Sequence, residues 1–197
     1  MSKRRQRVQN EPAYVLHNSA WRETSLLLQV FTPHYGILPL VAKGAKRPYS
    51  ALRSVLSVFQ PLSLSWSGAG EIKTLTQADT RGIHALSGRT LMSAWYLNEL
   101  LIRLVPREDP HEQLFATYAR CLHALAQTPN QLPYRLREFE WVLLQETGYG
   151  LDQRTPDFND PELEPYLRTL LRERIDEQLG RALRTREVLM DLRLYHG

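Results

Sequence analysis

The chain has 197 residues, of which 43% are hydrophobic and 23% are charged, and these proportions are ordinary for a folded soluble protein. The net charge of +4 is unevenly divided: residues 1–84 hold 11 Lys and Arg against 4 Asp and Glu, whereas residues 85–197 hold 14 against 17. A basic half joined to a mildly acidic half favours an anion-binding module on a neutral scaffold, with a chance asymmetry of the solvated surface as the alternative.

Several classes of protein are excluded by simple features. Cys121 is the only cysteine, so no intrachain disulfide can form, and we expect a reducing, cytoplasmic compartment. The basic start, Met1 to Arg7, runs into polar residues instead of an apolar stretch, which does not fit a secretory signal. No stretch approaches 18 uninterrupted apolar residues, so we expect no membrane-spanning segment.

The N-terminal region has the pattern of β-strands. Leu26, Leu28 and Val30 alternate with their neighbours, and so do Leu62 and Leu64, a period of two that is typical of strands. The expected strands are Tyr14–His17, Thr24–Thr32, Ile37–Lys43, Leu62–Trp66 and Glu71–Gln77, with a short turn or helix around Ala51–Val55. Five strands in about 70 residues, with a short insertion after the third, predict a small closed barrel of the OB type.

After about residue 86 the period becomes helical. The spacing of apolar residues predicts helices over about Leu91–Leu104, from Pro110 onward, and over Tyr134–Thr147, Glu162–Leu179 and Thr185–Leu192. Asp109 is expected to cap the second of these helices, and Gly148 and Gly180 are expected to end the third and fourth. The fold class is therefore α+β, with an OB-type barrel in residues 1–84 and an all-helical domain in residues 85–197.

Motifs for catalysis or metal binding are weak. The six histidines contain no pair at helical spacing, and Cys121 and His123 point to different faces of a helix. Gly68 and Gly70 lack the third glycine of a phosphate-binding loop and precede a strand. We therefore predict no catalytic residues, no metal and no cofactor, and a nuclease is disfavoured because two-metal chemistry needs converging carboxylates.

A cluster of basic residues is the strongest functional feature. The expected nucleic-acid-binding residues are Lys43, Lys46, Arg47, Tyr49, Arg53 and Lys73. Glycine and proline keep the loop from residue 43 to residue 49 exposed, so its cations can neutralise phosphates. Tyr49, with Trp21, Tyr35 and Trp66 as further candidates, offers a stacking surface, although Trp66 fits the core better. The alternative is that the loop is only a solubilising patch.

The helical half offers a second candidate surface. Arg135 and Arg137 precede Phe139 and Trp141 on one amphipathic segment, and arginine beside an aromatic ring can bind an acidic-hydrophobic peptide or a terminal carboxylate. Such arginines more often cover a packed helix. This surface supports a second hypothesis, a protein-interaction adaptor whose helical domain binds partner proteins while DNA contact is secondary.

The chain also resembles a known family, the bacterial recombination mediator RecO. The resemblance is carried by residues 23–28 (ETSLLL), 40–46 (LVAKGAK), 59–62 (FQPL), 71–75 (EIKTL), 96–101 (YLNELL), 139–140 (FE), 148–150 (GYG) and 179–189 (LGRALRTREVL). It implies an OB domain followed by a helical domain, binding of single- and double-stranded DNA, and annealing of complementary strands. The implied partners are RecR and the single-stranded DNA-binding protein, with RecA loaded indirectly during recombinational repair.

One segment departs from the family pattern. Many members have a longer stretch after the Gly-Tyr-Gly motif, often with a four-cysteine zinc site, but only about ten residues, Leu151–Asp160, fill that place here. The zinc site is therefore expected to be absent. A groove for the acidic C-terminal tail of the single-stranded DNA-binding protein is hypothesised near Arg135 and Arg137.

Overall fold

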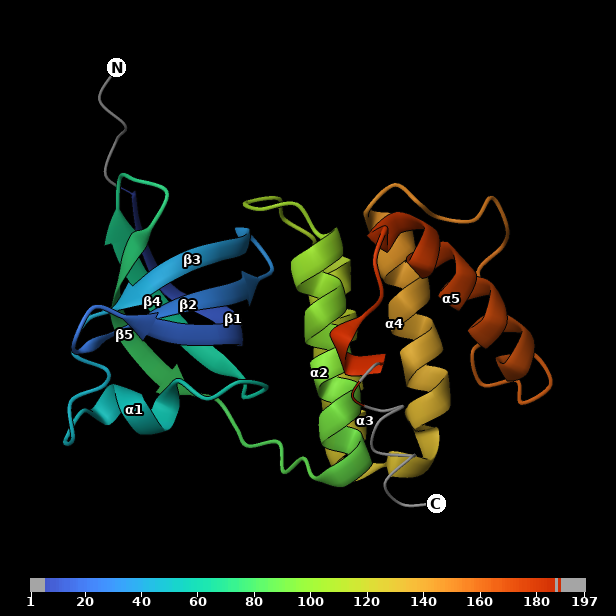
Figure 1. Ribbon diagram of the computed structural model, residues 1–197, viewed down its shortest axis with the longest axis horizontal. Helices are drawn as coiled ribbons and strands as arrows, with labels where there is room; N and C mark the ends of the chain where they lie inside the picture. Colours follow the sequence, from blue (N-terminus) through green and yellow to red (C-terminus); the bar gives the residue numbers. More distant parts are fainter. Residues whose placement is uncertain (1–5, 187, 189–197) are drawn as a thin grey trace. The chain divides into compact units, whose positions relative to one another are not determined.

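A computed structural model describes residues 6–186 and residue 188 of the chain (Figure 1). The described residues form two compact units, the first from those up to His84 together with Pro106–Glu112, and the second from Ala85–Val105 together with those from Gln113 onward. A segment between two helices thus belongs to the strand-rich unit.

The first unit is a closed five-stranded barrel with the strand order β1-β2-β3-β5-β4. Its elements are β1 (Gln6–Trp21), β2 (Ser25–Thr32), β3 (Gly36–Ala42), α1 (Ala51–Val55), β4 (Leu62–Gly68) and β5 (Lys73–Thr80). All neighbouring strands are antiparallel except β3 and β5, whose parallel pairing closes the barrel. This arrangement confirms the predicted OB-type barrel and its short helix after the third strand.

Strand β1 is much longer than the predicted Tyr14–His17. It pairs with β2 through its C-terminal half and with β4 through its N-terminal half, and its register shifts once in each pairing. Such bulges bend a strand, which allows one strand to serve two neighbours around a small barrel. The bulges also break the period of two, since Asn10 adopts a φ of 54° and Glu11 is buried. For this reason the sequence pattern alone predicts only a short strand.

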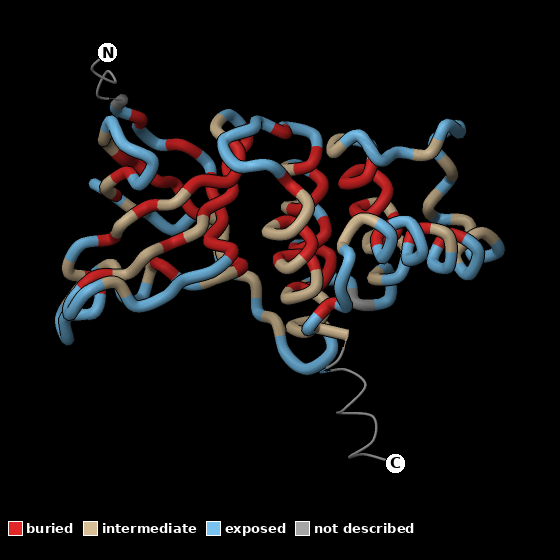
Figure 2. Tube along the Cα trace, turned by 45° about the horizontal axis from the view of Figure 1, so that its top comes forward, coloured by how far each residue is buried: buried red, intermediate tan, exposed pale blue. Residues whose placement is uncertain are grey.

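The barrel interior is filled by aliphatic side chains and one indole. Val15, Leu28, Val30, Leu40 and Leu64 are completely buried, and the fully buried Trp66 ring meets Tyr35 edge-on, with ring centroids 5.3 Å apart. Figure 2 colours the buried residues of the chain red. Burying this apolar surface is the main stabilising term, and it fixes the register because a one-residue slip would turn every core side chain outward.

The second unit consists of helices around their own core. They are α2 (Gly88–Leu104), α3 (Glu112–Gln127), the 3₁₀ turn η1 (Pro129–Gln131), α4 (Leu132–Glu146) and α5 (Glu164–Leu179). Buried Leu97, Leu122, Phe139 and Leu171 come from all four long helices. A pair of polar groups is also buried here, since the Tyr118 hydroxyl donates to Asn98 Oδ1 at 2.6 Å.

The structure confirms the predicted C-terminal ends of α4 and α5 but not the predicted start of α3. Gly148 and Gly180 follow α4 and α5 in the left-handed conformation (φ of 81° and 63°), as expected from their sequence positions. The predicted cap at Asp109 is wrong, because α3 begins at Glu112 and residues 106–112 pack with the barrel instead. The predicted last helix, Thr185–Leu192, falls largely outside the described residues.

Candidate nucleic-acid interface

The loop after β3 presents its cations because one small residue anchors it. Ala45 is completely buried, whereas Lys43, Lys46 and Arg47 on either side of it are exposed. Gly44 takes a φ of 72°, and the Arg47 N–H donates to the Gly44 carbonyl at 3.1 Å, which closes a tight turn. The three cations are therefore held at the surface by a fixed backbone.

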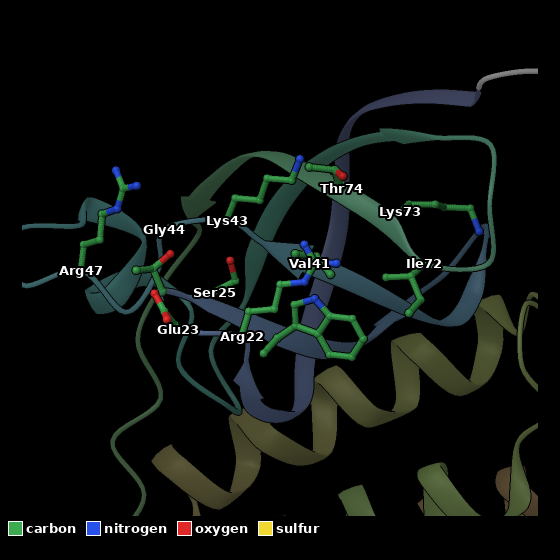
Figure 3. A pocket seen from close by; sticks show the side chains of 12 residues that line it. Arg22, Glu23, Ser25, Val41, Lys43, Gly44, Arg47, Ile72, Lys73 and Thr74 are labelled. Atoms are coloured by element: carbon green, nitrogen blue, oxygen red, sulfur yellow. The ribbon is translucent and has the colours of Figure 1, made fainter.

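A hydrogen bond joins this loop to the turn between β1 and β2. The Lys46 N–H donates to the Thr24 carbonyl at 2.9 Å. Arg22, in the same turn, has a φ of 54°, an uncommon value for a residue with a side chain. The two turns and the start of β5 thus enclose one pocket of about 780 Å³ (Figure 3).

This cationic pocket is defined by the residues that line it. They are Trp21, Arg22, Glu23, Thr24, Ser25, Val41, Lys43, Gly44, Arg47, Ile72, Lys73 and Thr74. In the part of the chain that the structure describes, Arg22, Lys43 and Arg47 form no ion pair with an acidic side chain. Three uncommitted positive charges around one hollow, with Glu23 as the single acidic side chain in its wall, give a site for an anion.

Lys73 also lines the pocket, but its charge is already matched. The residue is 8% exposed, and its Nζ lies 2.5 Å from Glu108 Oε1. Figure 3 shows its side chain extending away from Lys43. Glu108 belongs to the Pro106–Glu112 segment, whose backbone is fixed to β3 by the bond from the Glu108 N–H to the Ile37 carbonyl at 3.0 Å. Lys73 is thus a paired cation, unlike the three around it.

The other predicted DNA-binding residues lie outside the pocket wall. Lys46 and Arg53 are exposed, the latter in the last turn of α1, and Tyr49 is fully exposed. The structure therefore brings together Lys43, Arg47 and Lys73 of the predicted set. Lys46, Tyr49 and Arg53 extend the same basic loop region without forming the pocket.

Sequence reasoning missed the contribution of the β1–β2 turn. Arg22, Glu23 and Ile72 line the pocket but were not among the expected site residues, and Trp21 was considered only as a possible stacking surface. The sequence does contain a signal for this turn, because an aromatic residue and an arginine stand together between one predicted strand and the next. The antiparallel β2–β3 register, with Leu26 opposite Ala42, places this turn beside the end of β3. What the sequence could not show is the parallel pairing of β3 with β5, which adds Ile72 to the same wall.

The predicted peptide-binding residues of the helical unit are mostly committed to internal contacts. Arg137 is buried and donates to Glu140 Oε1 at 2.7 Å, with Glu164 Oε1 at 3.4 Å from its other terminal nitrogen. Phe139 is completely buried, and Arg135, partly exposed, bonds Glu138 at 2.9 Å. A peptide could reach the Phe139 ring only if the helical unit opened.

Two further structural observations concern metals and membranes. Among the described residues, no three or more His, Cys, Asp and Glu side chains are grouped so that they could hold a metal ion. Within the same residues, no helix combines the length and the apolar character needed to cross a bilayer.

Comparison with known proteins places this barrel and these helices in a family. Residues 6–84 match the family described as Recombination protein O N terminal, and residues 86–155 match Recombination protein O C terminal. Together the two stretches cover most of the chain. The chain belongs to the RecO family. This confirms the resemblance seen in the sequence, and the family is one of DNA repair proteins.

Curated relatives support the same assignment. The DNA repair protein RecO of Ralstonia nicotianae is 55% identical over 145 residues, which are 73% of this chain and 53% of that protein. The DNA repair proteins RecO of Azoarcus sp. and Dechloromonas aromatica are 50% and 51% identical, each over 75% of this chain and over 61% and 62% of their own lengths. The chain thus spans between about half and three-fifths of these RecO relatives.

Residues 151–160, the segment expected to depart from the RecO pattern, lie in the loop between α4 and α5. Its Phe158 ring packs against Trp141 of α4, with ring centroids 6.2 Å apart. The match to the RecO C-terminal family ends at residue 155, within this loop. This loop is therefore held to α4 by an aromatic contact.

Proposed function

We propose that this chain is a DNA-binding mediator of recombinational repair, which anneals complementary strands and helps to load RecA on single strands coated by the single-stranded DNA-binding protein. RecR and the C-terminal tail of that binding protein are the proposed partners. The observation that carries the DNA-binding part is the cationic pocket, whose wall on one side of an OB barrel includes Arg22, Lys43 and Arg47. Membership of a DNA repair family supports the rest.

Phosphates account for the main affinity. Each cation that neutralises a phosphate releases condensed counterions, and this entropy gain does not depend on base sequence. Because Lys43, Lys46 and Arg47 are exposed, they need not be desolvated from a buried site before they meet DNA. Contacts to the backbone also leave the base edges accessible, which a strand needs if it is to pair with its complement.

The DNA-binding role is tested by replacing Lys43, Lys46 and Arg47 together with alanine. Binding to all sequences should weaken alike, and the log–log dependence of affinity on salt should lose about 0.7 of slope for each phosphate contact removed on single strands, or about 0.9 on duplex. The measurement is fluorescence anisotropy with labelled oligonucleotides at several salt concentrations. Unchanged affinity would remove the loop from the interface.

A charge-matched control separates a site from a net-charge effect. Arg168, Arg172 and Arg174 are exposed on α5, so replacing all three with alanine removes the same formal charge from the other unit. This control should bind DNA as the unaltered protein does. An equal loss in both triple variants would mean that the whole-molecule charge, and not the pocket region, holds DNA.

The mediator role needs a separate experiment. Annealing of complementary strands coated with the single-stranded DNA-binding protein should be faster with the unaltered protein than with the loop variant. If the chain binds DNA but never accelerates annealing of coated strands, with or without RecR, the mediator proposal fails while DNA binding stands.

A further inference from the structure

The wall of the cationic pocket contains apolar side chains that phosphate binding does not explain. Trp21, the last residue of β1, pairs with Ser25 across the turn and is only partly buried. Ile72, just before β5, is 42% exposed. Both line the same hollow as Arg22 and Lys43. Large apolar surface left open beside free cations indicates a ligand that is itself partly flat and apolar.

The size and chemistry of the pocket fit one nucleotide of a single strand. Its volume of about 780 Å³ lies within the range of small-ligand pockets. A nucleotide joins a flat aromatic base to an anionic phosphate, and the pocket offers an indole beside cations. A base inside a duplex is already stacked on both faces, so only an unpaired base can turn toward Trp21 without the cost of unstacking.

We propose that Trp21 stacks against an unpaired DNA base while Arg22 and Lys43 hold the adjoining phosphates, with Ile72 completing the apolar part of the wall. This inference rests on the proposed DNA-binding function and adds a base contact to it. Phosphate contacts alone cannot distinguish a single strand from a duplex by its bases. A stacking residue makes the pocket selective for single strands of any sequence, because every base has a π-face.

The decisive experiment compares a normal single strand with an abasic strand of the same length and phosphate number. The unaltered protein should bind the normal strand more tightly, by roughly 5-fold to 150-fold, which corresponds to the usual stacking contribution per base. Trp21→Ala should bind the two strands equally, whereas Trp21→Phe should retain part of the preference. Affinity for duplex should be the same in all three proteins.

Two controls keep a folding defect apart from a binding defect. Thermal unfolding should show that Trp21→Ala remains folded, and Tyr166→Ala, which removes another exposed aromatic ring from α5, should keep the full preference for the normal strand. In addition, a normal strand should quench tryptophan fluorescence in the unaltered protein, and the quench should be largely absent in Trp21→Phe.

The outcomes separate this inference from the proposed function. If the unaltered protein binds normal and abasic strands tightly and equally, or if Trp21→Ala keeps the preference, the stacking role of Trp21 is wrong while phosphate binding stands. If the unaltered protein binds neither strand, the proposed function itself fails. A preference that Trp21→Ala abolishes and Trp21→Phe partly keeps supports the base contact.

Discussion

At the scale of single residues, the helical unit depends on a buried ionic group. Glu140 accepts hydrogen bonds from Arg137 at 2.7 Å and from the Tyr96 hydroxyl at 2.7 Å. Burial raises the pKa of Glu140, and it also raises the pKa of Tyr96 well above its ordinary value, with the Glu140 charge adding to the effect. The stability of the fold is sensitive to the loss of one partner of a buried ion pair, because the charge of the remaining partner is then buried without compensation.

We therefore expect Arg137→Met to destabilise the protein by about 3–5 kcal/mol, since it leaves the Glu140 carboxylate buried without its cation. Arg135→Met is the matched control, because Arg135 is 31% exposed and Glu138 keeps a second partner in Arg120. That change should cost less than about 1 kcal/mol. Urea unfolding of both variants measures the difference. A similar loss of unfolding free energy in both variants would show that the buried pair contributes no more to stability than the exposed one.

Sequence alone could predict the position of some of these residues but not of others, because some positions depend on contacts between distant parts of the chain. The exposure of Lys43 and Arg47 could be predicted because a glycine and a proline mark their loop as a surface loop. Arg137 could not be distinguished from a binding residue, since its i,i+3 spacing from Glu140 also fits an exposed helix face and its second partner, Glu164, lies 27 positions away in sequence. Trp21 was recognised as an aromatic candidate, but its place in one pocket wall with Ile72 depends on the parallel β3–β5 pairing that closes the barrel.

At the scale of elements, α2 fixes the chain that follows α5. Glu99 accepts hydrogen bonds from the backbone N–H groups of Arg184 and Thr185 at 2.9 and 3.0 Å, and Arg103 donates to the carbonyls of Arg181 and Ala182 at 2.9 Å each. Burial alone would raise the pKa of Glu99, but these N–H donors outweigh it and lower the pKa. The charged form of Glu99 is therefore the form that holds the segment.

This contact should loosen in acid. Because the pKa of Glu99 is lower in the folded state, its stabilising contribution is fully present above its ordinary value of 4.5 and is lost as the pH falls through the folded value. After correction for the intrinsic rate, hydrogen exchange at the Arg184 and Thr185 amides should accelerate below about pH 4.5. Glu99→Gln should exchange quickly at all pH values. A variant that still shows the acid transition would assign it to another group.

The segment between α2 and α3 contributes to the barrel a carboxylate that, under the proposed function, would compete with a DNA phosphate for Lys73. Glu108 neutralises Lys73 in the wall of the cationic pocket. Glu108→Gln should therefore strengthen binding to single strands, and the salt dependence should steepen by about 0.7 if Lys73 gains one phosphate. Glu112→Gln removes an exposed acid of the same segment and should leave the slope unchanged. Identical slopes in both variants would show that Lys73 does not reach DNA.

At the scale of the whole molecule, the strand and helix regimes of the sequence correspond to two units, but the chain does not divide at a single point. The periodic apolar residues identify strands and helices, because each period follows from the geometry of one element. The membership of residues 106–112 in the barrel has no periodic signal. It rests on single contacts, such as the Glu108 N–H to the Ile37 carbonyl, that connect distant positions.

A fragment of residues 1–84 should consequently form a weakened barrel. It retains all five strands but lacks Glu108, so the largely buried Lys73 ammonium loses a charged hydrogen bond that typically contributes about 1.5–3 kcal/mol. Hydrogen exchange at the core amides of β3 should be faster in the fragment than in the full chain. Lys73→Met in the fragment should recover part of the protection, because it removes the uncompensated charge. Equal protection in the fragment and the full chain would mean that the barrel is independent of the 106–112 segment. Residues 1–84 would then suffice to form the complete barrel domain.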